Sequence, residues 1–200
     1  MFPEIARDDI FRLETPRLWL RWPRAADQGS ICRLAGDPEV ALRTARIPHP
    51  YESYHAESFI LSARAENASG AGLTLALTQK RQADEAIGVI GVHGANARGT
   101  GMIGFWLGRP YWGRGLMSEA AGAFIDMVFG MTGLERIVSS ALPSNAASLR
   151  VHEKLGFTRA GQGKFPAPAR GGEVDVELFD LRRGAIPTSF GAKRPKLQAT

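Results

Sequence analysis

The spacing of hydrophobic and polar residues alternates along the chain between a period of two and a period near 3.6, which predicts a mixture of strands and helices. Arg17-Leu-Trp-Leu-Arg-Trp22 alternates as a strand does, after the turn-like Thr15-Pro16. Further strands are predicted at 73–78, 86–93, 101–107, 136–141, 157–160 and 174–181. Helices are predicted at 27–35, 52–68, 116–129 and 146–155, with an irregular stretch at 38–51 and a polar hairpin at 79–85.

The order of these elements is helices, a β-meander and then β-α-β-α-β-β, which is a mixed α/β (α+β) pattern. The 200 residues suffice for one domain with a sizeable core, and the chain holds neither a repeat nor a low-complexity tract. We expect an N-terminal arm at 1–12, a folded domain at 13–183 and a basic, disordered tail at 184–200.

Composition narrows the class of protein only a little. Hydrophobic residues make up 44% of the chain and charged residues 22%, which is ordinary for a globular protein. No apolar run approaches the ~20 residues of a membrane span, so we expect no membrane partner and a cytoplasmic location. The net charge is +5, but Lys193, Arg194 and Lys196 in the tail supply three of those charges, so no nucleic-acid binding is expected.

The histidines and the single cysteine give no sign of a metal site. Cys32 has no second cysteine with which to form a disulfide or a thiolate cluster. The four histidines show no paired ligand spacing, so no metal is expected.

A glycine-rich turn is the first candidate for chemistry. Gly113 and Gly115 stand between a predicted strand, which ends at Leu107, and a predicted helix, which begins at Leu116. Glycines in this position let backbone N–H groups converge on an anion, and the helix dipole assists. A plain tight turn is the alternative interpretation.

Two better-known phosphate motifs fail on this chain. Gly108 and Gly113 have the Walker A spacing, but Arg114 replaces its lysine and Gly115 its Ser/Thr. A G-x-G-x-x-G run at residues 99–104 leads into a predicted strand, whereas a dinucleotide fingerprint must open a helix. The sequence therefore favours a site for a phosphate that is bound without a metal ion. It argues against the nucleotide site of a kinase or a dehydrogenase.

A second candidate lies on the predicted helix 146–155. At ~100° per residue, Asn145, Ser148 and His152 fall on one face, beside the apolar stripe that should face the core. This is where a buried cleft would find polar groups. The alternative makes Asn145 a helix N-cap, Ser148 a filler and His152 a satisfied core histidine.

Taken together, these stretches resemble the GNAT superfamily of acyl-CoA N-acyltransferases, and within it the RimJ/RimL-type branch that includes ribosomal-protein N-terminal acetyltransferases. The resemblance runs from about Leu13 to Leu181 and rests on the order and spacing of several motifs. These are Thr15-Pro-Arg-Leu-Trp-Leu-Arg21, Ile87-Gly88, Ile103-Gly-Phe-Trp-Leu107, Tyr111-Trp-Gly-Arg-Gly-Leu-Met-Ser-Glu-Ala120, Asn145-Ala-Ala-Ser148 and Glu153-Lys-Leu-Gly-Phe157.

The resemblance implies a GNAT fold: a mixed sheet of about six to seven strands, flanked by about four helices and splayed at an acetyl-CoA cleft. It further implies that the cofactor is held by the backbone of Phe105, Trp106 and Leu107, by the amides of Gly113, Arg114, Gly115 and Leu116, and by Asn145. Ser148 would lie near the thioester sulfur.

The chain departs from the family pattern at two positions. Pro110 replaces a Gln/Arg and has no N–H to donate, so Arg109 or Arg114 would have to contact the phosphate instead. His152 stands where many members have the tyrosine that protonates the leaving thiolate. Ser148 and His152 are therefore both candidate acids.

The implied activity is direct transfer of an acetyl group, in a ternary complex, from acetyl-CoA to a primary amine of a protein N-terminus or a small molecule. Glu119 and His93 are candidate bases, although each also fits an ordinary surface or edge position. The stretch 43–54 is expected to shape the acceptor pocket, with His49, Tyr51 and Tyr54 as candidate lining residues beside His93. A catalytically weak acyl-CoA sensor is the alternative, and a homodimer is compatible with either.

Overall fold

The computed structural model of the chain describes residues 1–94, 96 and 99–185, together with the backbone of 197–198. Its described strands form a single mixed sheet in the order β7-β8-β6-β5-β4-β3-β2-β1-β9. The strands are β1 (Arg12–Glu14), β2 (Leu18–Arg21), β3 (Leu73–Gln79), β4 (Gln82–His93), β5 (Thr100–Leu107), β6 (Arg136–Ala141), β7 (Thr158–Ala167), β8 (Gly172–Arg182) and β9 (Leu197–Gln198).

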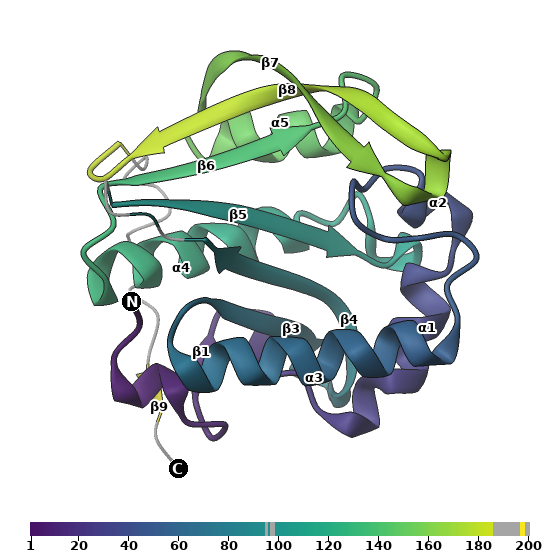
Figure 1. Cartoon of the computed structure of the whole chain (residues 1–200). Coiled ribbons are helices and arrows are strands. Elements are labelled where there is room, and N and C mark those ends of the chain that lie inside the picture. Colours follow the sequence, from purple (N-terminus) through teal and green to yellow (C-terminus); the bar gives the residue numbers. More distant parts are fainter. Residues whose placement is uncertain (95, 97–98, 186–196, 199–200) are drawn as a thin grey trace.

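Helices cover both faces of this sheet (Figure 1). One face carries α4 (Leu116–Met131) and α5 (Ala146–Lys154), and the other carries α1 (Gln28–Ala35), α2 (Pro38–Ala41) and α3 (Ser53–Ser69). Short 3-10 turns are η1 (Glu4–Arg7), η2 (Ala25–Asp27), η3 (Arg109–Tyr111) and η4 (Pro168–Arg170).

The predicted α/β class and the order of elements are confirmed, and the sheet has more strands than expected. The additional strands, β1 and β9, have only three and two residues, too few to show a periodic pattern. Helix α2 lies within the stretch expected to be irregular. Its start is an Asp37 N-cap, whose side chain accepts from Glu39 N, followed by Pro38 at the first helical position.

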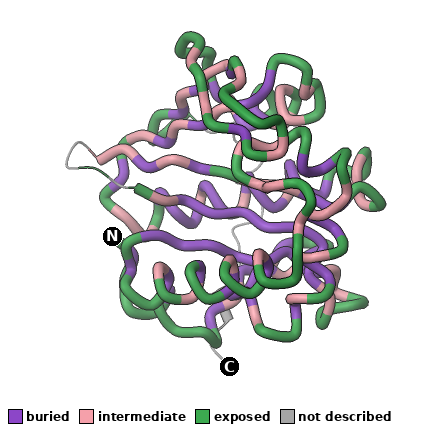
Figure 2. Tube along the Cα trace, turned by 45° about the vertical axis from the view of Figure 1, so that its right-hand side comes forward, coloured by how far each residue is buried: buried purple, intermediate pink, exposed green. Residues whose placement is uncertain are grey.

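The main core lies between the sheet and α4. Helix α4 buries residues such as Ala120, Phe124 and Val128 completely, and the strands contribute alternate residues such as Leu18 and Leu20. The central strands are therefore buried along most of their length, while the outer helix faces are exposed (Figure 2).

The N-terminal segment packs against this core, because Phe2, Ala6 and Phe11 are buried in it. Most of the expected tail, residues 186–196 and 199–200, lies outside the described residues, and residues 197–198 pair with β1. The domain boundaries remain a prediction.

One local feature of the sheet determines where a ligand can enter. β5 and β6 are parallel and pair only from Thr100↔Arg136 to Met102↔Val138. Ser139 Oγ still reaches the Ile103 carbonyl at 3.2 Å, but beyond this point the two strands diverge, as Figure 1 shows. β5 stays paired to β4 as far as Leu107↔Gly88, so the opening lies on the β6 side of residues 104–107.

Candidate active site

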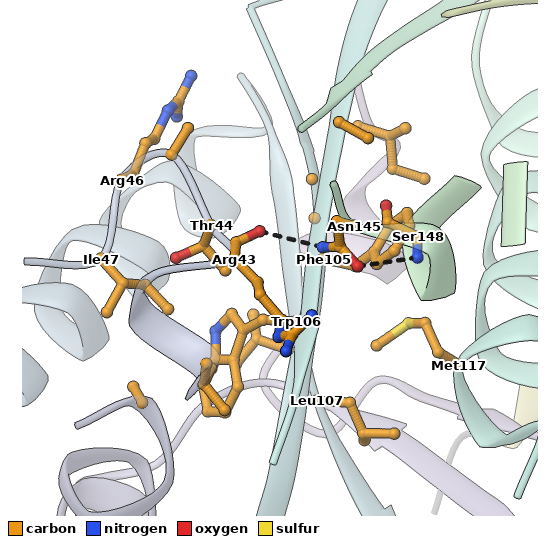
Figure 3. A pocket seen from close by; sticks show the side chains of 18 of the residues that line it. Arg43, Thr44, Arg46, Ile47, Phe105, Trp106, Leu107, Met117, Asn145 and Ser148 are labelled. Carbon is orange, nitrogen blue, oxygen red and sulfur yellow. Dashed lines mark hydrogen bonds between the residues drawn. The ribbon is translucent and has the colours of Figure 1, made fainter. Parts of the chain in front are cut away.

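A cavity of about 1170 Å³ runs through the divergence of β5 and β6 and reaches both faces of the sheet. On one side it is lined by the start of α4 and by α5, and on the other by α3 and by the segment 43–48. Figure 3 shows residues of α5, β5 and segment 43–48 around it. The spaces on the two faces of the sheet are therefore continuous.

The start of α4 presents backbone donors to the first half. Gly113 and Gly115 have φ of +75° and +71°, in the left-handed region that favours glycine. The N–H groups of residues 113–118 have no hydrogen-bond partner among the described residues. A methyl group added to Gly113 would meet nothing within 4 Å, so space for a ligand adjoins these donors. The turn thus has the donors and the room for a phosphate group.

Arg109 and Arg114 were expected to make the phosphate contact that Pro110 cannot make, but neither side chain lines the cavity. Arg109 and Arg114 are exposed, and Arg109 Nη1 is 3.9 Å from Asp37 Oδ2. The Arg114 carbonyl accepts a hydrogen bond of 2.8 Å from Arg17 Nη1, which fixes the loop's backbone.

Strand β5 supplies the wall of the cavity. Phe105, Trp106 and Leu107 all line it. The Leu107 carbonyl already accepts a 2.6 Å hydrogen bond from Trp112 Nε1, so this oxygen is engaged within the protein. Trp106 also packs against the small cluster of Ile31 and Ile60 beneath α1 and α3.

Asn145 and Ser148 lie at the start of α5 and line the same cavity. Asn145 is the N-cap, and its Oδ1 accepts from Ser148 N at 3.2 Å. Its Nδ2 donates to the Arg43 carbonyl at 3.1 Å, which ties α5 to segment 43–48 (Figure 3). Asn145 is therefore an N-cap that also borders the cavity. The Ser148 hydroxyl has no hydrogen-bond partner among the described residues.

His152 is separated from the cavity by its own burial. The side chain is 1% exposed and its ring packs among Phe105, Phe157 and Phe179. Nδ1 is 2.8 Å from the Ser148 carbonyl, and Nε2 is 2.8 Å from Ser139 Oγ. A carbonyl only accepts, so Nδ1 carries the proton, and in the neutral ring Nε2 accepts the one proton of the Ser139 hydroxyl, which then does not donate to the Ile103 carbonyl 3.2 Å away.

Burial lowers the pKa of His152 to about 4, although the hydrogen bond with Ser148 opposes the shift. A neutral, enclosed ring with both nitrogens engaged offers no proton to the cavity. The structure therefore favours the satisfied core histidine over the proton donor, the two alternatives that the sequence left open.

The structure does not bring Glu119 to the cavity, contrary to the expectation of a base. Its carboxylate accepts from Thr15 Oγ1 at 2.7 Å, from Arg17 N at 2.9 Å and from Arg17 Nε at 2.6 Å. Burial alone would raise the pKa of Glu119, but the hydrogen bonds from Thr15 and Arg17 outweigh it and lower the pKa. An ionised carboxylate held by three donors anchors α4 and is a poor proton acceptor.

Of the four residues expected to line the acceptor pocket, two line the cavity and two do not. Tyr51 and His93 line the cavity, whereas His49 and Tyr54 are exposed and do not. Tyr54 packs instead on His55, with ring centroids 4.0 Å apart. Burial, with a smaller contribution from Cys32, raises the pKa of Tyr51 to about 12, so its phenol stays protonated.

Sequence reasoning missed the polar lining contributed by α3 and β3. His55, Ser58, Ser62 and Glu66 line the cavity from one stripe of α3, and Thr74 faces them from β3. The outer face of α3 is polar as well, so its sequence shows no amphipathic contrast that would reveal an inward-facing polar stripe. The spacing of residues 55, 58, 62 and 66 was the available signal.

The described residues contain neither a metal site nor a helix that could span a membrane. Among the described residues no group of three or more His, Cys, Asp or Glu could hold a metal ion. Within the same part of the chain, no helix combines the length and apolarity that crossing a bilayer requires.

Comparison with known proteins identifies the family. Residues 17–158 match the model of the acetyltransferase (GNAT) domain. The chain is 31% identical over 170 residues to the uncharacterized N-acetyltransferase p20 of Bacillus licheniformis, covering 84% of this chain and 94% of that protein.

Solved structures share the fold. Mycobacterium smegmatis RimJ in complex with CoA-disulfide has a TM-score of 0.75 and 22% identity, covering 92% of this chain and 94% of that one. The ribosomal-protein-S5-alanine acetyltransferase of Vibrio fischeri has a TM-score of 0.74 and 20% identity, covering 88% and 99%. With the splayed strands and the glycine turn in place, this chain belongs to the GNAT family of acetyl-CoA-dependent N-acyltransferases.

Proposed function

We propose that this chain transfers the acetyl group of acetyl-CoA directly to a primary amine that enters from the opposite face of the sheet. The observation that carries the proposal is the continuous cavity, which joins the donors at the start of α4 to the polar pocket beneath α3 through the opening beside β5. Two substrates that approach from opposite faces can meet there without a covalent acyl-enzyme.

The coenzyme's diphosphate is assigned to the unpaired amides of residues 113–118. Gly113 and Gly115 supply the left-handed backbone that turns these N–H groups outward, and the α4 dipole favours the negative charge. The pantetheine arm is assigned to residues 104–107 of β5, where pairing with β6 has ended. Arg109 and Arg114 are exposed close by and can follow a phosphate with flexible side chains.

Ser148 is the group we assign to protonate the leaving thiolate. Its hydroxyl lines the cavity, and its backbone is held by Asn145 at one side and by His152 at the other. A thiol with a reference pKa of ~8.5 is already a good leaving group, so a single hydroxyl donor suffices. We assign His152 the role of positioning Ser148 and the start of the opening.

The acceptor is a primary amine of a protein N-terminus or of a small molecule. An α-amine with a pKa near 7.8 costs about 1 kcal/mol to deprotonate at pH 7, against about 4.6 kcal/mol for a lysine side chain near 10.4. The α-amine therefore needs less help from the protein. One solved structure of the same fold is named a ribosomal L7/L12 alpha-N-protein acetyltransferase, which agrees with an α-amine acceptor.

The test is release of free CoA from acetyl-CoA in the presence of a panel of N-terminal peptides and small primary amines. Gly113→Val, strained at φ +75° and with its side chain in the diphosphate space, should abolish the heat of acetyl-CoA binding in calorimetry. Ser148→Ala should keep that binding and lower kcat by roughly 10- to 100-fold.

Circular dichroism of both variants controls for misfolding. Unchanged acetyl-CoA binding by a folded Gly113→Val would remove the diphosphate assignment. Tight acetyl-CoA binding by the wild-type protein, with no turnover on the whole panel, would instead favour the sensor alternative.

A further inference from the structure

The two halves of the cavity differ in charge. The coenzyme half lies between α4 and α5, and the acceptor half lies beneath α3 and segment 43–48. Figure 3 shows Ser148 of α5 on one side of β5 and segment 43–48 on the other. Among the described residues of the lining, Glu66 of α3 is the only acid, so the coenzyme half has none. The charged residues of the coenzyme half are Arg150 and Lys154, both from α5.

These two cations have no partner among the described residues. Neither Arg150 nor Lys154 makes a hydrogen bond or an ion pair with another side chain or carbonyl there. Glu153 lies between them in the sequence, but it is outside the lining and pairs with neither. The helix dipole favours a cation in the last turn, which accounts for Lys154 but not for Arg150, one turn earlier. Two like charges four residues apart repel each other on a helix, so this pair gains from an anion bound beside it.

The helical period places both cations at the outer edge of the cavity-facing side of α5. Spacings of three and four put four lining residues on one side of the helix, and these are residues 147, 150, 151 and 154. Exposure rises across this side, because Ser148 and Val151 are half-buried whereas Arg150 and Lys154 are exposed. The cations therefore form the rim of the coenzyme half, and Ser148 lies deeper.

The proposed function sets the direction in which the coenzyme lies. It assigns the thioester end to Ser148 and the diphosphate to the amides of residues 113–118. The part of acetyl-CoA beyond the diphosphate is an adenosine whose ribose carries a 3′-phosphate. This end extends toward the solvent rim, because the pantetheine arm and the thioester occupy the deep part of the coenzyme half.

The chemistry of the two side chains matches a phosphate monoester. Such a group carries about −1.5 to −2 charges at pH 7, which two cations balance. A guanidinium donates two parallel N–H groups to phosphate oxygens, and an ammonium adds a compact charge. Because they are four residues apart, Arg150 and Lys154 are neighbours on the helix surface and can contact the same phosphate.

We propose that Arg150 and Lys154 bind the 3′-phosphate of acetyl-CoA and make this chain select CoA thioesters over pantetheine thioesters that lack this phosphate. The inference rests on the proposed function and adds a specificity for the acyl donor. The phosphate is remote from the thioester carbon, so the two residues act on coenzyme binding and not on the chemical step.

The test compares two coenzymes that differ in one phosphate. In calorimetry, the wild-type protein should bind acetyl-CoA on the order of 10-fold more tightly than acetyl-3′-dephospho-CoA. The double variant Arg150→Gln/Lys154→Gln should bind both thioesters equally, because its affinity for acetyl-CoA falls while its affinity for the dephospho compound stays. Added salt should reduce the wild-type preference, since both cations are exposed.

A matched control removes the same two charges elsewhere. Arg81 and Lys164 are exposed and lie outside the cavity lining. The double variant Arg81→Gln/Lys164→Gln should therefore keep the wild-type preference for acetyl-CoA. Circular dichroism shows whether both double variants are folded, and the ratio of the two affinities within one variant does not depend on small differences in its stability.

Equal affinity of the wild-type protein for the two thioesters overturns the inference. A preference that survives in Arg150→Gln/Lys154→Gln also overturns it, because the phosphate is then bound elsewhere. The same holds for an equal loss in the control, which would make the preference an effect of net charge. Failure of the proposed function gives a different result, in which the wild-type protein prefers acetyl-CoA in calorimetry but acetylates no amine of the panel.

Discussion

His152 shows how burial decides the role of a single side chain. The ring lies among aromatic residues, and its Nδ1–H and Nε2 link α5 to β6 through Ser148 and Ser139. Because burial holds the pKa at about 4, the ring remains neutral through the physiological range. The neutral form is what lets Nε2 accept the Ser139 proton.

This lowered pKa predicts a defined pH dependence of stability. The folded pKa falls from 6.5 to about 4, so between these values the unfolded chain binds the proton and the folded chain does not. The free energy of unfolding should therefore decrease as pH falls from about 6.5 to 4, by about 3 kcal/mol from this group. Urea unfolding of wild type and His152→Phe across this range checks it. The variant should show the shallower slope, and parallel slopes would contradict the argument.

At the residue scale, the sequence singled out groups that belong to a local motif. Gly113, Gly115, Asn145 and Ser148 all line the cavity, and their roles in binding and catalysis stay predictions. The spacing of residues 55, 58, 62 and 66 marks a polar stripe on α3, but it does not show that Glu66 contacts His93, 27 residues away.

At the scale of one element, α4 depends on an anchor from β2 and its preceding turn. Thr15 and Arg17 hold the Glu119 carboxylate in the first turn, and Arg17 also donates to the Arg114 carbonyl. The helix start and the glycine turn are thereby fixed to the sheet edge. The carboxylate near the helix N-terminus also complements the dipole.

Glu119→Gln should lower the free energy of unfolding by about 1 kcal/mol, after allowance for the half-exposed Arg17. Because the folded pKa of Glu119 is lowered, this contribution is present above the ordinary glutamate pKa and is lost as pH falls below it.

Acetyl-CoA affinity should weaken a few-fold, since the Arg114 backbone loses its anchor. Denaturant unfolding and calorimetry measure both. Asp126→Asn, on the same helix with no partner among the described residues, is the matched control, and equal effects of the two changes would refute the anchor.

Most helices and strands could be predicted from the sequence, because the two-residue and 3.6-residue periods of hydrophobic residues reflect which side chains are buried. The divergence of β5 and β6 was not, since it depends on where pairing stops after Met102↔Val138. Only the family resemblance led us to expect it. Helix α2, within the stretch expected to be irregular, was missed because its four residues are too few to show a period; Pro38 behind the Asp37 cap begins it.

At the scale of the whole molecule, contacts between distant parts of the chain hold the wall of the cavity in place. Arg170, in the turn between β7 and β8, donates through Nε and Nη2 to the Leu42 carbonyl, 128 residues away. Figure 1 shows this end of the hairpin beside α2. Asn145 adds a second bridge to the Arg43 carbonyl. No sequence pattern predicts such contacts, because each depends on the completed fold.

These bridges hold segment 43–48, which lines the acceptor half of the cavity. Arg170→Ala should therefore raise KM for the acceptor amine roughly fivefold, equivalent to about 1 kcal/mol of lost positioning. Acetyl-CoA affinity should stay unchanged, because the hydrogen bonds of Arg170 among the described residues go to Leu42 and not to α4 or β5. Lys164→Ala, which removes an exposed ion pair with Asp175 in the same hairpin, should leave KM at the wild-type value. Steady-state kinetics with the amine varied at saturating acetyl-CoA separates the two cases. An equal rise in both variants would mean that the hairpin acts through general stability, because Lys164 makes no contact with Leu42 like that of Arg170 among the described hydrogen bonds.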